Sequence, residues 1–274
     1  MRLDAQILLA TNQLFPPRAR RHATEQAHFE HTYTVAQERA AAFARHVDFS
    51  GKRLLDIGCG FGAKGIFYAK ETPVSEVVGL DLNPRRIEQA KRYAAKSNVE
   101  PSRIHFETGD GSRLPFDDDS FDLILSEDMI EHVVDVPGFL AECRRILRTG
   151  GAVLMRGGPF YFSPWGAHLY YQFGMPWVSL LFSRNAIADA SSTLPQPEGV
   201  FLTSTLAEEI EQFDELNRLT PRRLTQLVDA SGLGRAHWEW GPRRLRPLGC
   251  LPWLGPLFTA SLTAVLVERR PLQN

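Results

Sequence analysis

The sequence predicts an α/β fold, in which helices cover both faces of a mostly parallel sheet. Between residues 53 and 155, short apolar segments alternate with helical segments, which is typical of a parallel, doubly wound sheet. A glycine-rich turn at Gly58–Gly62 directly follows the first apolar segment, where a strand would pass into a helix. Ligands of such sheets bind at the carboxyl ends of the strands, so the functional residues are expected there.

Short apolar runs bounded by turn residues predict seven strands. They cover residues 53–57, 77–80, 104–107, 123–126, 152–155, 237–240 and 262–268. Helices are predicted at residues 22–46, 63–71, 84–97, 139–147 and 220–232, two of them with Pro in the first turn. Residues 148–151 are expected to form a turn before the fifth strand.

The regular alternation stops after residue 156, and this break suggests how the chain is organised. The residues that follow are rich in aromatic side chains, Pro and Ser, which predicts an insertion or lid. We therefore expect four parts, namely an N-terminal helical cap at 1–50, a ligand-binding core at 51–156, the lid insertion at 157–215 and a C-terminal completion of the core at 216–274. Because 43% of the 274 residues are hydrophobic, the chain can bury a large core.

Charge and cysteine content exclude several classes of protein. The 31 Lys and Arg residues nearly balance the 32 Asp and Glu residues, so no strong field attracts a nucleic acid. Three widely spaced cysteines without a CxxC pair favour a reducing, cytoplasmic setting over a disulfide framework or a zinc site. The first residues lack the long apolar region of a signal peptide, and prolines interrupt the apolar segment 245–267, which argues against a transmembrane helix.

The turn after the first strand has the composition of a ligand-binding loop. Its glycines let the backbone approach a ligand closely, and Asp56 stands at the end of the strand before them. With Ala63, Gly58 and Gly60 also satisfy the GxGxxG/A pattern of dinucleotide sites. The loop alone is therefore also compatible with a nicotinamide dinucleotide as the cofactor.

Carboxylates after the next two strands narrow the choice of cofactor. Asp81 ends the second strand, where it can accept both hydroxyl hydrogens of an adenosine ribose in either NAD or S-adenosylmethionine (SAM). Asp110 adds an acceptor where an adenine amino group would lie. SAM carries an ammonium group and a sulfonium but no pyrophosphate, so Asp56 suits SAM and would repel a phosphate.

Five segments in a fixed order carry a resemblance to a known family. They are LLDIGCGFG, VVGLDLNP, FETGDGSRLPF, FDLILSEDMIEHV and RRILRTGGAVLM, and together they span roughly residues 53–156. In this order they resemble the class I SAM-dependent methyltransferases, especially the small-molecule group typified by ubiquinone and menaquinone biosynthesis methyltransferases. The resemblance implies a Rossmann-like, seven-stranded sheet with an antiparallel last strand, and SAM as the cofactor.

By the same resemblance, the residues that bind SAM follow the ends of the first four strands. They are Asp56, Gly58 and Gly60 at the methionine part, Asp81 at the ribose, and Asp110 with Gly111 at the adenine. Neighbouring positions complete the expected site, namely Cys59, Leu82, Ser126 and Glu127.

His132, after the fourth strand, is the expected catalytic residue. Methyl transfer to an alcohol or phenol requires removal of a proton, and imidazole titrates near working pH. A packing or hydrogen-bonding role is the alternative. Asp128, Glu131 and His132 would share one face if this segment were helical, which suggests either a divalent-ion site or a solvated helix face, so the metal is left unknown.

Four residues outside the core are expected to contact the acceptor substrate. Tyr33 lies in the N-terminal segment, and Tyr161, Trp165 and His168 follow the fifth strand within ten residues. This aromatic composition suits an apolar or lipid-linked acceptor. The alternative is that these aromatic residues form the small core of the insertion itself.

Apolar segments next to arginines also permit a weak contact with a membrane surface. The arginines concerned are Arg184, Arg243, Arg244 and Arg246.

The function predicted from these features is SAM-dependent methylation of a small-molecule acceptor. An oxygen nucleophile is expected, on an apolar, lipid-linked, sugar or secondary-metabolite substrate, while carbon and nitrogen acceptors stay open. An NAD-dependent oxidoreductase and a non-catalytic SAM-binding protein are the alternatives. The sequence does not identify the acceptor, because the fold serves many chemistries.

Overall fold

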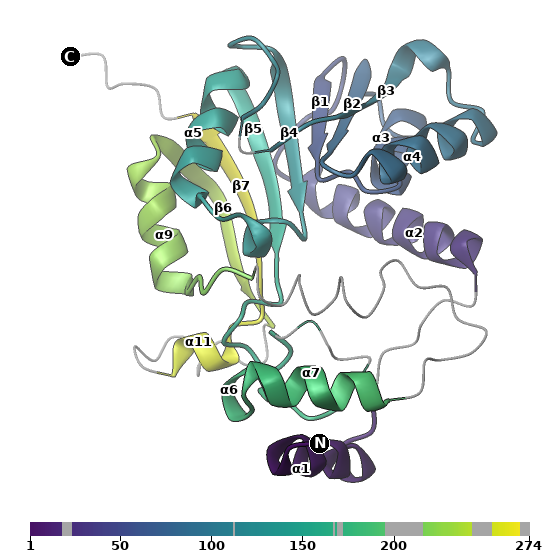
Figure 1. The fold of residues 1–274 in the computed structure, drawn as a ribbon. Helices are drawn as coiled ribbons and strands as arrows, with labels where there is room; N and C mark the ends of the chain where they lie inside the picture. Colours follow the sequence, from purple (N-terminus) through teal and green to yellow (C-terminus); the bar gives the residue numbers. More distant parts are fainter. Residues whose placement is uncertain are drawn as a thin grey trace. The chain divides into compact units, whose positions relative to one another are not determined.

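The structure, a computed structural model, describes residues 1–17, 24–111, 113–166, 168, 172–194, 216–242 and 254–268 (Figure 1). The chain forms two compact units. The first unit contains residues 1–28, 158–223 and 240–261, and the second contains residues 29–157, 224–239 and 262–274. The predicted four-part division at residues 50, 156 and 215 stays a prediction.

A seven-stranded sheet organises the second unit (Figure 1). Its strands are β1 (Arg53–Ile57), β2 (Glu76–Asp81), β3 (Ile104–Thr108), β4 (Phe121–Glu127), β5 (Leu147–Gly157), β6 (Leu233–Gly241) and β7 (Ser261–Glu268). They lie in the order β3-β2-β1-β4-β5-β7-β6. Strands β1 to β5 pair in parallel, and β7 pairs antiparallel with β5. This confirms the predicted Rossmann-like sheet, with the last strand inserted between the fifth and the sixth.

Helices cover both faces of this sheet. Alternate residues of each strand point to opposite faces, so the apolar side chains on both faces have to be covered. Leu54, Val77 and Leu123 point into a core that α2 (Glu25–Phe43), α3 (Ala63–Glu71) and α4 (Pro84–Lys96) close. Figure 1 shows α5 (Val136–Ile146) and α9 (Pro221–Ala230) at the other side.

The helix α4 begins where the sequence contains both common start signals. Its first residue is Pro84, and the side chain of Asn83 accepts a hydrogen bond from the backbone N–H of Arg85. The expected helix at residues 84–97 is therefore confirmed to within one residue.

The first unit has a separate small core. Its described residues include the helices α1 (Leu3–Leu14), α6 (Val178–Leu181), α7 (Arg184–Thr193) and α11 (Gly255–Phe258). Helix α1 packs on α7 through Ala5 and Leu8. The Ser183 hydroxyl accepts a hydrogen bond from the backbone N–H of Ala186 and so caps α7. Among the described residues, no helix is both long and apolar enough to cross a membrane.

Several boundaries differ from those predicted, since β6 begins at Leu233 rather than at 237 and α2 ends at Phe43 rather than at 46, and two further differences have a visible cause. The expected turn at 148–151 lies inside β5, because the pairing with β4 shifts from Phe121↔Leu147 to Leu123↔Ala152 and the extra residues bulge out of the strand. Helix α5 begins three residues before the expected start at 139. The side chain of Asp135 caps it by accepting a hydrogen bond from the backbone N–H of Gly138, and Pro137 fits its first turn.

Gly79 provides a test of how tightly β2 packs beside the glycine loop. A Cβ atom on Gly79 would overlap Phe106 Cδ1 and lie 3.0 Å from Cys59 Sγ. We therefore predict that Gly79→Ala lowers the free energy of unfolding by about 1–3 kcal/mol, measured by urea denaturation. The control is Gly65→Ala in α3, where the added Cβ makes only ordinary contacts and stability should not fall. Equal loss in both variants would contradict this account.

Candidate functional site

The carboxyl ends of the parallel strands meet at one edge of the sheet. In the strand register, Ile57 lies beside Leu80 on one side and beside Ser126 on the other. Asp81 lies beside Thr108, the last residue of β3. The residues predicted to follow the strand ends are therefore brought together at this edge.

The glycine loop is fastened to β2 by its backbone. The N–H groups of Gly58 and Cys59 donate to the carbonyl oxygen of Leu80 at 2.8 and 3.0 Å. Gly60 has a φ of +57°, and a Cβ built on it would meet no described atom within 4 Å. A Cβ on Gly62, by contrast, would lie 2.7 Å from the ring of Phe106. Gly60 thus leaves room beside the backbone, whereas Gly62 permits close packing of helix on sheet.

Asp81 joins the glycine loop to the start of α4. Its Oδ2 accepts from the backbone N–H of Gly60 at 2.9 Å, and its Oδ1 accepts from that of Asn83 at 2.9 Å. Leu82 beside it is exposed, while Cys59 is buried, and burial raises the pKa of its thiol. The Cys59 sulfur is therefore neutral and acts as an apolar group in this loop.

The predicted adenine residues follow β3. Asp110 is exposed and Gly111 is half-buried, and the backbone N–H of the preceding Gly109 donates to the carbonyl oxygen of Asp81 at 3.1 Å. This bond holds the loop that carries Asp110 beside the end of β2.

Asp56 is the most unusual group at this edge. Its side chain is fully buried, and among the described residues neither carboxylate oxygen has a hydrogen bond of standard geometry, although the backbone N–H of Gly65 exerts a weak attraction. Burial raises the pKa of Asp56 from its ordinary 3.8 to about 7, while Lys64 opposes the shift. A buried carboxylate with unused acceptor positions suits a ligand that brings positive charge.

A chain of charged side chains extends from this point to α2. Glu127 at the end of β4 is buried, and its Oε2 accepts from Arg39 at 2.7 Å and lies 3.9 Å from Lys64 Nζ. Ser126 beside it is also buried, and no described residue bonds its hydroxyl. Sequence reasoning found Ser126 and Glu127 but missed both cations. The available signal for Arg39 was its place beside Ala36 and Ala40 on the buried stripe of α2.

The segment after β4 is not the helix on which a divalent-ion site would depend. Asp128 has a φ of +56°, and only the short 3-10 turn η2 (Ile130–His132) follows it. The Asp128 carboxylate accepts from Arg39 at 2.8 Å and lies 3.7 Å from Arg156. Burial alone would raise the pKa of Asp128, but Arg39 and Lys64 hold it below its usual range. The spacing of Asp128, Glu131 and His132 along the sequence therefore does not place them on one helix face.

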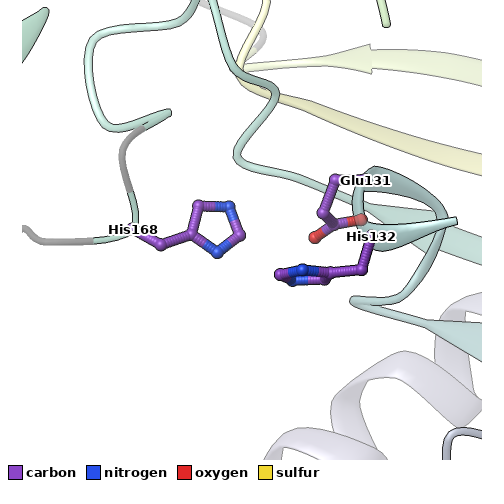
Figure 2. A group of neighbouring side chains, drawn as sticks. All are labelled: Glu131, His132 and His168. Atoms are coloured by element: carbon purple, nitrogen blue, oxygen red, sulfur yellow. The ribbon is translucent and has the colours of Figure 1, made fainter. Parts of the chain in front are cut away.

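Glu131 and His132 come from the same turn (Figure 2). Glu131 is buried and His132 is half-buried. Met129, which precedes them, contacts the glycine loop, since a Cβ on Gly58 would lie 3.2 Å from its sulfur. This contact places the turn η2 next to the predicted cofactor loop.

The predicted substrate residues belong to different units, Tyr33 to the second and the other three to the first. The Tyr33 hydroxyl donates to Glu71 at 2.7 Å, at the end of α3 that is farther from the glycine loop. His168, labelled in Figure 2, belongs to the first unit, where its Nε2 lies 2.8 Å from the carbonyl oxygen of Pro159. In the same unit, Trp165 accepts a backbone bond from His168, and Tyr161 packs against the small core.

Comparison with known proteins identifies the family. A family model described as a methyltransferase domain matches residues 55–155. The demethylmenaquinone methyltransferase of Deinococcus radiodurans is 32% identical over 197 residues, which cover 71% of this chain and 73% of that protein. The chain belongs to the class I SAM-dependent methyltransferases. It acts on a small molecule and uses SAM as its cofactor.

Other relatives match this methyltransferase over less of their length. The ubiquinone biosynthesis O-methyltransferase of Cereibacter sphaeroides (strain ATCC 17029 / ATH 2.4.9) is 35% identical over 124 residues, which cover 44% of this chain and 48% of that protein. The ajmaline N-methyltransferase of Rauvolfia serpentina is 31% identical over 121 residues, which cover 43% of this chain and 41% of that protein. The chain thus spans about half the length of these two relatives or less.

A solved structure confirms the fold. The SAM-dependent methyltransferase from Mesorhizobium loti superposes with a TM-score of 0.56 at 22% identity and covers 85% of this chain and 99% of that one.

The residues at the sheet edge fit SAM. When bound, SAM supplies a methyl group on a positively charged sulfur. In the part of the chain that the structure describes, the Asp56 carboxylate has no hydrogen bond of standard geometry, and it matches the positive charges of SAM. The space beside Gly60 lets the loop backbone approach the cofactor closely, and the Asp81 carboxylate matches the two ribose hydroxyls.

The raised pKa of Asp56 predicts a pH dependence of cofactor binding. The ammonium group that SAM shares with its product S-adenosylhomocysteine (SAH) needs the ionised carboxylate, so the affinity for both should rise with pH up to about 7 and then level off. Calorimetric titration with SAH between pH 5.5 and 8.5 measures this. Asp56→Asn should bind SAH at least tenfold more weakly at pH 8, with no step near 7.

The same group predicts an opposite trend for the stability of the ligand-free protein. The unfolded chain ionises Asp56 near pH 4, but the folded chain ionises it only near 7. The contribution of Asp56 to the free energy of unfolding therefore falls as pH rises from about 4 to 7. Asp56→Asn should remove that slope, and an unchanged slope would contradict the assignment.

Proposed function

We propose that this methyltransferase acts on an oxygen nucleophile of an apolar, lipid-linked, sugar or secondary-metabolite acceptor. The observation that carries the proposal is the position of His132, on the turn that follows β4 and contacts the glycine loop through Met129. An alcohol or phenol must lose a proton when it is methylated, and a half-buried imidazole is suited to accept it. Methyl transfer otherwise requires mainly alignment of the reacting atoms and exclusion of water.

The names of the relatives agree with this range of acceptors without selecting one. They include a demethylmenaquinone methyltransferase, a ubiquinone biosynthesis O-methyltransferase and a phthiotriol/phenolphthiotriol dimycocerosates methyltransferase of Mycobacterium leprae. The ajmaline enzyme is named as an N-methyltransferase. Oxygen as the acceptor atom rests on His132 rather than on these names.

Exposed apolar side chains in the first unit support an apolar acceptor and a weak contact with a membrane surface. On α1, Leu3 and Leu14 are 73% and 78% exposed, and Leu181 on α6 is 58% exposed. Arg184 begins α7 and is exposed, whereas Arg243, Arg244 and Arg246 lie outside the described residues. Exposed leucines beside basic residues are typical of segments that touch a lipid surface.

Methyl transfer from labelled SAM to a panel of acceptors tests the proposal. The panel contains a hydroquinone with a short isoprenoid tail, a simple phenol, a sugar alcohol and a matched aromatic amine. We expect labelled methyl ethers, with the apolar phenols as the best substrates. Label found only on nitrogen or carbon would contradict the choice of an oxygen acceptor.

Substitution of His132 tests its role as the general base. His132→Asn should lower kcat by about 10²- to 10⁴-fold and leave the affinity for SAH within a few-fold of the wild type. The control is His105→Asn, because His105 is exposed on the edge strand β3 and should be dispensable. Full turnover by His132→Asn would remove the proposed base.

A further inference from the structure

The ammonium group of Lys64 is buried beside the expected SAM site, although SAM itself carries positive charges. It is the second residue of α3, and its side chain is only 11% exposed. Its Nζ donates to the backbone carbonyl of Glu127 at 3.1 Å and lies 3.9 Å from the Glu127 carboxylate. The side chain therefore reaches from the first turn of α3 to the end of β4.

This position is unfavourable for a lysine on general grounds. The N-terminal end of a helix carries partial positive charge, which repels a cation. Burial of an ammonium group removes its hydration, which costs several kcal/mol unless close partners compensate. Burial alone would lower the pKa of Lys64, but Asp56 and Glu127 raise it above its ordinary value. Lys64 is therefore charged, and the two buried carboxylates are what hold it so.

The other charged groups around Lys64 are divided among several elements. Arg39 from α2 bonds both Glu127 and Asp128 through one nitrogen, at 2.7 and 2.8 Å. Asp56 comes from β1 and Asp81 from β2, and the buried hydroxyl of Tyr68 comes from α3. Arg156 at the end of β5 lies 3.7 Å from Asp128.

Arg39 bonds one oxygen of Glu127 and one of Asp128. Among the described residues it makes no bond to Asp56, and Glu127 Oε1 has no hydrogen-bond partner. For Asp56, the nearby positive charge that acts most strongly is that of Lys64.

We propose that Lys64 is a positioning residue of the cofactor site, which orients the Glu127 end of β4 and favours the ionised form of Asp56 that the positive charges of SAM require. Without such a cation, the fully buried Asp56 would take up a proton more readily, because desolvation disfavours its charged form. Lys64 thus favours binding of another cation indirectly, through the carboxylates between them. This inference does not depend on the acceptor or on His132.

The alternative is a purely structural role, in which Lys64 is a hydrogen-bonded strut between α3 and β4. The two roles differ in their dependence on pH. Loss of a strut weakens SAH binding equally at all pH values, whereas loss of the charge moves the midpoint of the pH dependence upward, and high pH restores binding.

The experiment is calorimetric titration of the full chain with SAH between pH 6 and 9. Lys64→Gln keeps a side-chain donor for the Glu127 carbonyl but removes the charge. We expect it to bind SAH at least tenfold more weakly at pH 7, with a midpoint about one pH unit or more above that of the wild type. Lys64→Arg keeps the charge, so its midpoint should stay within a few tenths of a unit.

Two controls keep the test decisive. Lys91→Gln removes an exposed lysine of α4 and should leave both affinity and midpoint unchanged. If Lys64→Gln does not fold, Lys64→Met, which keeps a long side chain without its charge, is titrated instead and should show the same upward shift. A wild-type midpoint in whichever neutral variant folds would overturn the proposal, and so would a midpoint moved by one unit or more in Lys64→Arg.

Discussion

The carboxylate of Asp56, fully buried near the end of β1, is the constraint around which the site is built. An ionisable group at that depth needs opposite charge nearby or it becomes protonated. Lys64 supplies part of that charge, and SAM supplies the rest when it binds. The raised pKa of Asp56 reflects this incomplete compensation in the ligand-free protein. The buried carboxylate thus lowers the stability of the ligand-free protein and raises its affinity for a positively charged group.

The glycines around Asp56 make that arrangement sterically possible. Gly79 lets the ring of Phe106 lie against β2, and Gly62 accepts the same ring from the side of α3. Because helix and strand approach so closely, the first turn of α3 brings Lys64 within reach of the end of β4. Gly60 then leaves open space beside the loop, so packing and ligand access use different glycines of one short segment.

Much of this arrangement follows from local sequence patterns. Strands such as Arg53–Ile57 are short apolar runs, and acids such as Asp56 and Asp81 stand at their ends, where parallel strands bring them together. Arg39 could not be found in this way, because its partners lie 88 and 89 residues away and only the folded chain shows them. The spacing of Asp128, Glu131 and His132 suits one face of a helix, but the left-handed backbone at Asp128 interrupts such a helix. Periodicity alone does not reveal such a conformation.

The proton balance of cofactor binding tests this account most directly. Calorimetry of SAH binding at pH 6.5, repeated in buffers of different ionisation enthalpy, counts the protons exchanged. Asp56 is mostly protonated at that pH before the ligand arrives and must ionise to face its ammonium group. The account predicts the release of a substantial fraction of one proton, which Asp56→Asn abolishes. Binding without exchange of protons, or with uptake, would contradict it.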